Sequence, residues 1–206
     1  MSGAAITVER GDMLGETFRR RITEVYVRAF ADDFRGFSRD ASKLADAFEH
    51  MLLLERFHLA LVDGEPAGLA SLTEGDEQLF APDRREILRH LGPVRGRIAD
   101  RVIRSWFMGA HAGSRPGVAE IGFVATEPAH QGKGVATALL THLLALPQYR
   151  EYVLEDIKDT NGAALHLYAK LGFEVYRRRS VRFSRRAGFN ELVSMRLAQD
   201  TPPRAT

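Results

Sequence analysis

The sequence predicts an α/β fold in which helices flank a mixed sheet, and three observations lead to this prediction. Short apolar runs of strand length alternate along the chain with segments whose apolar residues recur at helical spacing. The pair Asp63-Gly64 between two apolar runs is typical of an antiparallel hairpin. Residues 120–157 read as strand, helix and strand, a unit whose two strands lie parallel. Both kinds of strand pairing would therefore occur in one sheet.

Composition indicates one domain without cysteine chemistry. The chain has 206 residues, 45% of them hydrophobic and 27% charged, which is long enough for one buried core and short for two. We expect the domain to span residues 5–199 and the polar, proline-containing residues 200–206 to form a disordered tail. Because the sequence has no cysteine, it has no disulfide, thiol nucleophile or cysteine-ligated metal site.

Charge and hydropathy argue against a nucleic-acid-binding or membrane protein. A net charge of +2 is too small to require a nucleic-acid partner. No segment reaches the roughly 18 apolar residues of a membrane span, and residues 1–9 lack the basic and apolar regions of a signal peptide. We therefore expect a soluble, cytoplasmic protein without a membrane partner.

The first part of the chain predicts two amphipathic helices and a hairpin. Apolar residues recur every three or four positions in both helices, and Asp40 or Ser42 can cap the second. These helices would cover one side of the sheet. The expected elements are a strand at 6–8, helices at 14–30 and 44–52, and hairpin strands at 57–62 and 67–72.

Two inserted helices are expected after the hairpin. Residues 81–108 show helical periodicity with a break at Gly92-Pro93. The two helices would either form a wall of a substrate pocket or simply pack on the sheet, and the sequence does not decide between these roles. Residues 110–117, rich in Gly, Ser and Pro, are expected to form a flexible linker to the next strand.

Residues 120–137 predict a strand, a glycine loop and the start of a helix. Pro128 ends the apolar strand, and leucines at helical spacing follow Gly134. The first turn of a helix has N–H groups without internal partners and carries partial positive charge, so an anion can bind there. Gly132 and Gly134 lack the β-carbons that would keep a phosphate away from the backbone. An ordinary helix-capping loop is an equal alternative on this evidence alone.

Two better-known phosphate loops are excluded at this position. The G-x-x-x-x-G-K-S/T loop would require glycine where Glu127 stands and Ser or Thr where Gly134 stands. The dinucleotide fingerprint G-x-G-x-x-G would end at Thr137, which is not glycine. The remaining expected elements are a strand at 152–157, a helix at 161–171 between the cap Asn161 and Gly172, strands at 173–176 and 191–197, and a long connection at 177–190.

Two motifs in this half of the chain resemble those of the GCN5-related N-acetyltransferase (GNAT) superfamily. Residues 131–136 match its R/Q-x-x-G-x-G/A loop, and Asn161 with Tyr168 before the Leu-Gly-Phe of residues 171–173 matches its second motif. Both occur in the family's order, and the resemblance covers most of residues 6–197. It implies a mostly antiparallel sheet that splays between its fourth and fifth strands. The helices of residues 81–108 lie outside the shared pattern.

The resemblance implies acetyl-CoA as cosubstrate and no metal ion. The pyrophosphate would bind backbone N–H groups of the glycine loop, and the strand before it would hold the peptide-like pantetheine arm as an added strand would be held. Asn161 would hydrogen-bond the same arm. The residues expected to bind acetyl-CoA are Val124, Ala125, Thr126, Gln131, Gly132, Lys133, Gly134, Val135, Ala136, Thr137 and Asn161.

The expected reaction needs a base and an acid. An amine attacks a thioester in its neutral form, yet it is mostly protonated near pH 7, so a base must take its proton directly or through a water. The resemblance assigns this role to Glu120, and Asp156 and Glu155 on the neighbouring strand are the alternatives. Glu120 could instead be a buried or ion-paired carboxylate of the strand without a catalytic role. Tyr168 matches the family's acid, and a tyrosine of the core is its alternative.

The function expected from these residues is transfer of an acetyl group from acetyl-CoA directly to a primary amine, because no cysteine and no serine with an evident histidine partner suggests an acyl-enzyme. The sequence does not identify the acceptor, a small molecule or a protein. A non-catalytic acyl-CoA-binding regulatory module is the alternative. Exposed final strands would also allow a homodimer.

A run of six arginines and three histidines are interpreted as ordinary structural residues and not as a binding site. The arginines of residues 177–186 could contact a nucleic acid or the adenosine 3′-phosphate, but a solvated edge strand and loop is the favoured interpretation. The three histidines lack the spacing of metal ligands. The arginines are Arg177, Arg178, Arg179, Arg182, Arg185 and Arg186, and the histidines are His130, His142 and His166.

Overall fold

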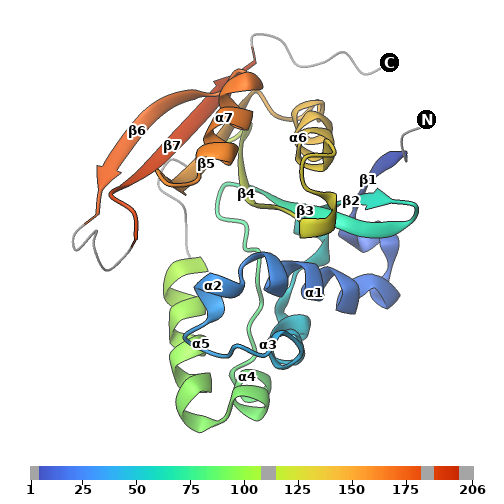
Figure 1. The fold of residues 1–206 in the computed structure, drawn as a ribbon, viewed down its shortest axis with the longest axis vertical. Coiled ribbons are helices and arrows are strands. Elements are labelled where there is room, and N and C mark those ends of the chain that lie inside the picture. The colour runs from blue at the N-terminus through green and yellow to red at the C-terminus, as the bar shows by residue number, and fades with distance from the viewer. Residues whose placement is uncertain (1–4, 108–114, 182–187, 200–206) are drawn as a thin grey trace.

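The computed structural model describes residues 5–107, 115–181 and 188–199, in which a seven-stranded sheet carries helices on both faces (Figure 1). The strands are β1 (Ile6–Arg10), β2 (Phe57–Val62), β3 (Glu65–Glu74), β4 (Val118–Thr126), β5 (Glu151–Lys158), β6 (Glu174–Ser180) and β7 (Glu191–Ala198). The helices are α1 (Arg19–Ala29), α2 (Ala31–Phe34), α3 (Ala41–Phe48), α4 (Arg84–Leu91), α5 (Pro93–Phe107), α6 (Val135–Leu144) and α7 (Gly162–Lys170).

The sheet is mixed and opens between two of its strands. Its order is β1-β2-β3-β4-β5-β7-β6, and β4 and β5 are parallel while the other neighbours are antiparallel. Pairing between β4 and β5 ends at Glu120 and Val153, although both strands continue beyond these residues. The predicted α/β fold, with a mostly antiparallel sheet that splays between its fourth and fifth strands, is confirmed.

A bulge bends each of the two diverging strands. Phe123 in β4 and Asp156 in β5 have φ angles of 47° and 52°, in the left-handed region that residues other than glycine seldom adopt. At the same places the register shifts against β3 and against β7, and a bulge bends the strand that carries it. The Phe123 ring is held by the rings of Phe30 and Phe80, at centroid distances of 5.2 and 5.6 Å. Aromatic packing therefore supports the strained residue at the opening.

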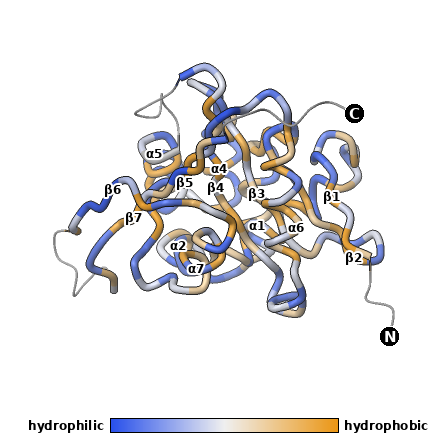
Figure 2. Tube along the Cα trace, turned by 90° about the horizontal axis from the view of Figure 1, so that it is seen from above, coloured by the Kyte–Doolittle hydropathy of each residue, from blue (hydrophilic) through white to orange (hydrophobic). Residues whose placement is uncertain are grey.

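Each face of the sheet has its own hydrophobic core. One core contains Tyr26 of α1, Phe48 of α3 and Phe57 of β2, and the other contains Leu139 of α6 and Tyr168 of α7. Figure 1 accordingly shows α6 and α7 on one side of the sheet and α1 to α5 on the other. Figure 2 shows apolar residues in the central strands and a hydrophilic β6. The prediction that the first two helices cover one side of the sheet is confirmed.

The inserted helices form where they were predicted, and they extend the helical layer. Gly92, with a φ of 79°, and Pro93 separate α4 from α5. Ile87 of α4 and Ile103 of α5 are buried in the core that α1 and α3 share, and α4 packs against α3 and α5. The pair therefore packs mainly on other helices instead of lying flat on the sheet. None of the described helices is both long and apolar enough to cross a membrane.

Helix boundaries differ from the prediction at the first helix. Gly11–Leu14 and Glu16–Phe18 are short 3-10 turns, so the α-helix begins at Arg19. Gly15 between the two turns has a φ of 79°, which a continuous right-handed helix cannot include. At the next helix Asp40 is the cap, and Ser42 is not, since Asp40 Oδ1 accepts a hydrogen bond of 3.1 Å from the Lys43 N–H.

β6 is longer than predicted. The expected strand ended at residue 176, but β6 continues to Ser180, so part of the predicted connection at 177–190 is strand. Arg177, Arg178 and Arg179 pair with residues 194, 193 and 192 of β7 and are exposed, which confirms the edge-strand interpretation for them. Arg182, Arg185 and Arg186, the tail at 200–206 and most of the linker at 110–117 lie outside the described residues.

Acid is expected to destabilise the protein through His58. This β2 side chain is 6% exposed and lies against His142 of α6, with ring centroids 5.4 Å apart. Burial, with smaller contributions from His142 and Arg10, lowers the pKa of His58 to about 4. In the unfolded chain a histidine titrates near pH 6.5, so the unfolded state binds this proton more readily. The free energy of unfolding therefore has its full value with respect to His58 above about pH 6.5, and it decreases as the pH falls toward 4.

We expect His58 to account for on the order of 3 kcal/mol of the loss in unfolding free energy between pH 7 and pH 4. Urea unfolding of the wild type and of His58→Gln across this range measures the effect, since the variant should show a smaller dependence on pH. His166→Gln, at an exposed position of α7, is the control. Equal pH dependence in wild type and His58→Gln would contradict the prediction.

Candidate active site

Glu120 lies where the pairing between β4 and β5 ends. Its neighbours Ala119 and Ile121 are buried in the core beneath α6, so strand alternation turns Glu120 toward the opposite face, that of α1. Glu120 is half-buried, opposite Thr73 of β3 and Val153 of β5. The predicted base therefore stands at the mouth of the gap between the diverging strands.

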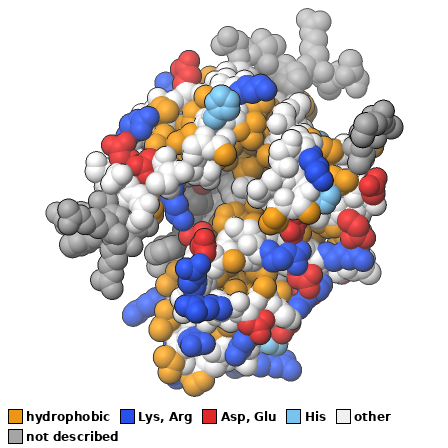
Figure 3. All heavy atoms as spheres, in the orientation of Figure 1, with side chains coloured by type: hydrophobic (Ala, Val, Ile, Leu, Met, Phe, Trp, Pro, Cys, Tyr) orange, Lys and Arg blue, Asp and Glu red, His pale blue; other side chains and the backbone are white. Residues whose placement is uncertain are grey.

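α2 borders this gap on the side that Glu120 faces. The junction of α1 and α2 packs on β4 through the contact of Phe30 with Phe123, and Asp33 of α2 forms an ion pair of 2.9 Å with Lys158 at the end of β5. Beside these contacts is an open cavity of about 430 Å³. Figure 3, in the view of Figure 1, shows a hollow near the middle of the molecule, above the layer of α1 to α5. The described residues that line the cavity are Ala31, Asp32, Arg35 and Arg39.

The second half of β4 presents an edge to the gap. Ala125 and Thr126 pair with Leu69 and Gly68 of β3 on one side, while the ladder with β5 on the other side stops at Glu120 within the described strands. Val124 and Ala125 pack toward opposite cores, so the triplet of residues 124–126 would offer its backbone to a ligand. An extended ligand can bind such an edge as an added strand.

Gly68 allows β3, β4 and α6 to meet closely. A β-carbon at this position would lie 2.7 Å from the Ala125 carbonyl oxygen and 2.7 Å from Val135 Cγ1. The sequence interpretation did not single out Gly68, although a glycine inside a strand pattern is a signal of close backbone approach. Its role is to bring the start of α6 up to the end of β4.

The glycine loop has the conformation that the two glycines permit. Gly132 and Gly134 have φ angles of 73° and 86°, and β-carbons there would meet no described atom within 4 Å. The glycines are therefore needed for their left-handed backbone and leave open space outside the loop. Gln131 Nε2 donates to the Thr126 carbonyl at 3.4 Å, which folds the loop back over the end of β4. Lys133 is exposed.

The first turn of α6 is open to an anion. Gly134 is its N-terminal cap and has no side-chain capping bond, and N–H groups of a first helical turn have no acceptor within the helix. Val135 is 1% exposed, so its side chain belongs to the core and its backbone would face a ligand, while Thr137 is exposed. With the helix dipole, these N–H groups, including that of Ala136, suit a phosphate.

Asn161 and Tyr168 lie at the start and near the end of α7. Asn161 Oδ1 accepts a hydrogen bond of 3.3 Å from the Ala164 N–H, so it caps the helix as predicted, while its NH₂ group can still donate to a ligand. Tyr168 is 5% exposed and packs on Phe173 at 6.1 Å. Burial raises the pKa of Tyr168 to about 12, so the phenol holds its proton at neutral pH. A core position and a proton-donor role are compatible in this residue.

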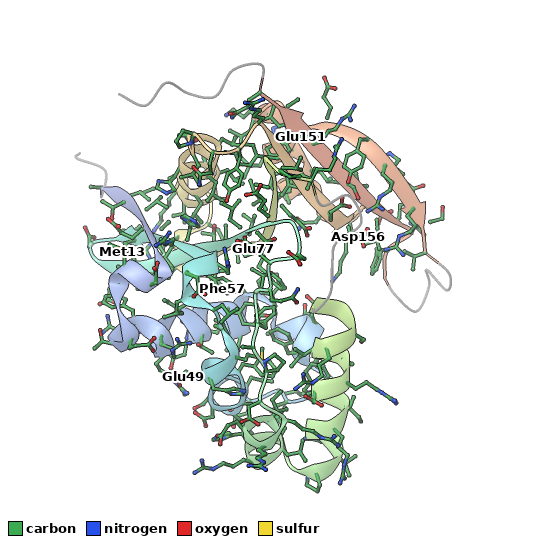
Figure 4. All side chains as sticks on the ribbon, turned by 180° about the vertical axis from the view of Figure 1, so that it is seen from behind. Met13, Glu49, Phe57, Glu77, Glu151 and Asp156 are labelled. Carbon is green, nitrogen blue, oxygen red and sulfur yellow. The ribbon has the colours of Figure 1, made fainter. Side chains whose placement is uncertain are left out.

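The alternative bases on β5 are engaged in ion pairs. Glu155 accepts from Arg177 and, at 2.7 Å, from the Ser194 hydroxyl, and Asp156 pairs with Arg179 at 2.8 Å. Figure 4 shows Asp156 at the end of β5 away from Glu151. A proton on either carboxylate would break a bond that fastens β6 to the sheet. These arginine partners were missed by the sequence interpretation, because they lie more than twenty residues away along the chain.

No group of three or more His, Asp or Glu side chains that could hold a metal ion occurs in the described part of the chain. The described structure thus combines a splayed β4–β5 pair, a glycine loop that leads into a helix without a side-chain cap, a glutamate where the pairing ends, and a buried tyrosine on α7.

A family model described as the acetyltransferase (GNAT) family matches residues 19–173. No curated protein sequence matches the chain. The structure of yncA from Salmonella typhimurium, assigned as an acetyltransferase and solved with its cofactor acetyl-CoA, is 21% identical, with 98% of this chain and 99% of that one covered and a TM-score of 0.55.

Two further solved structures have the same fold. The ribosomal-protein-S18-alanine N-acetyltransferase of Escherichia coli is 18% identical over 98% of this chain and 99% of that one, with a TM-score of 0.56. An N-acetyltransferase of Staphylococcus aureus Mu50 is 16% identical over 93% and 100%, with a TM-score of 0.62. At these identities the likeness concerns the fold.

Proposed function

Because the chain belongs to the GNAT family of acetyltransferases, we propose that it transfers the acetyl group of acetyl-CoA directly to a primary amine. The observation that carries the proposal is the end of β4–β5 pairing at Glu120 and Val153, beside a glycine loop that leads into a helix without a side-chain capping bond. The first feature leaves a strand edge for the pantetheine arm, and the second leaves N–H groups for the pyrophosphate.

The coenzyme would bind along this path through backbone groups. Residues 132–137 would hold its pyrophosphate, residues 124–126 its pantetheine arm, and the Asn161 NH₂ group would donate to the same arm. The acetyl carbon would then lie in the gap near Glu120. An acceptor amine would reach it from the side of α2, where the open cavity lies.

The transfer would proceed in one attack without an acyl-enzyme. Glu120 first takes a proton from the ammonium form of the acceptor, directly or through a water, and passes it to solvent, and the neutral nitrogen then bonds to the acetyl carbon. The carbon–sulfur bond of the tetrahedral intermediate then breaks, and the leaving sulfur takes the proton of Tyr168. The raised pKa of Tyr168, about 12, keeps that proton available at neutral pH. The nitrogen of the new amide then loses its extra proton, which restores the Tyr168 phenol directly or through solvent, so one proton is released in each cycle.

Calorimetric titration with acetyl-CoA and a CoA-release assay over an amine panel test the proposal together. We expect saturable binding and amine-dependent release of CoA for at least one amine class among amino acids, polyamines, aminoglycosides, lysine peptides and free N-terminal peptides. Binding without release for every amine would instead support a non-catalytic acyl-CoA-binding module. Absence of binding would refute the site.

Gly134→Ala is expected to weaken CoA binding about tenfold, a change of about 1.4 kcal/mol. Alanine is strained at the φ of 86°, and relief of that strain would turn the first N–H groups of α6 away from the phosphates. Gly64→Ala in the β2–β3 turn is the matched control, because Gly64 has a φ of 82° and equally open surroundings. Both variants should lose similar stability, and equal CoA affinity in both would contradict the prediction.

A further inference from the structure

Glu127 connects the end of β4 to the glycine loop. It follows Thr126, the last residue of β4, and precedes Pro128, where a 3-10 turn begins. Its N–H donates to the Ala67 carbonyl of β3 at 2.8 Å, and its own carbonyl accepts from the His130 N–H at 2.8 Å. The backbone of Glu127 is therefore fixed to the sheet on one side and to the loop on the other.

The side chain of Glu127 is fixed to α1. Its Oε1 accepts hydrogen bonds from Arg28 Nε at 3.1 Å and from Arg28 Nη2 at 2.8 Å. The Glu127 side chain is 16% exposed and the Arg28 side chain 46%. Because the carboxylate is largely buried, this pair is screened less than one on the open surface. A single guanidinium group therefore joins the side chain of this residue to α1.

Arg28 is itself held in a row of charges along α1. Glu24 pairs with Arg28 at 3.7 Å and with Arg20 at 3.0 Å. Arg20 in turn pairs with Asp46 of α3 at 2.6 Å and with Glu49 at 3.2 Å. The guanidinium of Arg28 thus has a fixed place relative to both helices.

The charge of Glu127 also matters for the ligand. A carboxylate beside an anion-binding loop repels a phosphate, and a paired arginine cancels that repulsion. Loss of Arg28 would both release the loop and leave a bare negative charge near it. Loss of the Glu127 charge would release the loop but remove the repulsion. The two substitutions should therefore weaken ligand binding to different extents, and substitution of Arg28 should weaken it more.

We propose that Arg28 and Glu127 are positioning residues for the coenzyme, which hold the glycine loop so that the first N–H groups of α6 face the phosphates. Arg28 acts through Glu127, and Glu127 acts through the backbone of the loop. This inference rests on the proposed function, because it concerns the same loop. It adds two residues that the motifs of the sequence do not include.

Calorimetric titration with CoA tests the inference. Arg28→Gln should raise the Kd for CoA about tenfold and Glu127→Gln about threefold, and the double variant should resemble Glu127→Gln. In the transfer assay the KM for acetyl-CoA should rise with Kd while kcat at saturation changes little, and Arg28→Lys, which keeps a cation, should recover most of the affinity. Thermal unfolding checks that each variant is folded. If Arg28→Gln is not folded, the Kd values of Arg28→Lys and Glu127→Gln are compared with that of the wild type instead.

The matched control is the ion pair between Arg21 of the same helix and Glu65 of β3, 2.8 Å apart and exposed to 52% and 65%. Arg21→Gln and Glu65→Gln should leave the Kd for CoA unchanged. Unchanged Kd in Arg28→Gln, or an equal rise in Arg21→Gln, would overturn the positioning role while the proposed function stands. A wild-type protein that does not bind CoA would overturn the proposed function and this inference with it.

Discussion

Glu120→Gln is expected to lower kcat by about two to four orders of magnitude and to leave the affinity for acetyl-CoA near that of the wild type. The amide keeps the shape of the side chain but cannot accept the proton of the attacking amine. Glu120 is the last residue of β4 that pairs with β5, and it faces the side of α2, so it can take a proton from the amine without touching the phosphates. Initial rates of CoA release with the best amine of the panel, together with calorimetric Kd values, measure both effects.

The pH profile provides a second test of the same assignment. Without a base, Glu120→Gln depends on the free amine in solution, whose fraction rises with pH through the amine pKa, about 10 for a lysine side chain and about 8 for a peptide N-terminus. The rate deficit of the variant should therefore shrink as the pH rises. Glu151→Gln, at the other end of β5, is the control and should keep its activity. If Glu155→Gln or Asp156→Asn loses activity and Glu120→Gln does not, the base lies on β5 and the assignment is wrong.

Tyr168→Phe is expected to lower kcat about a hundredfold with little change in the Kd for acetyl-CoA. The substitution keeps the ring against Phe173 and removes the proton that the leaving sulfur would take. Since burial raises the pKa of Tyr168 to about 12, ionisation of this phenol should not lower the wild-type rate at any pH below about 11. The same CoA-release assay measures the rates, from neutral pH upward.

A second buried tyrosine provides the matched control for this substitution. The Tyr152 hydroxyl donates to the Leu143 carbonyl at 2.7 Å, away from the gap. Tyr152→Phe should cost about 1 kcal/mol of stability and leave kcat unchanged. Full activity in Tyr168→Phe would show that its ring serves the core alone.

Most strands could be predicted from the sequence because turn residues mark their ends. Asp63 and Gly64 have φ angles of 52° and 82°, the left-handed pair that an antiparallel two-residue turn requires. They place β2 correctly, whereas β3 extends two residues beyond the predicted 67–72 at each end, because the turn takes only two residues. The break at Gly92-Pro93 follows for the same reason. The start of α1 could not be predicted in this way, since the apolar periodicity continues through the two 3-10 turns and Gly15 alone marks the interruption.

The length of β6 could not be predicted from local pattern. Three successive arginines do not resemble a strand, and they become one because β7 offers a partner and acidic residues of β5 receive two of the side chains. In general the contacts missed are those between distant residues. Arg28 and Glu127, 99 residues apart along the chain, have no local signal that would join them.

The glycine loop and the residues of α7 could be placed because each combines a motif with a local conformation. Gly134 is the cap of α6, and Asn161 is the cap of α7, so helix chemistry and motif agree at both sites. The divergence of β4 and β5 came from the resemblance alone. Its physical cause, the paired bulges at Phe123 and Asp156, depends on packing against neighbouring strands and aromatic rings that the sequence does not order in space.

The charged edge of β6 has a consequence for the behaviour of the protein in concentrated solution. Unpaired edge strands invite other chains to stack on them and can seed aggregates. Here the guanidinium groups of β6 and the carboxylates that pair with them would have to shed water in such a contact, and a register shift between Val175 and Arg177 interrupts the flat ladder with β7. Stacking through β6 is thereby disfavoured.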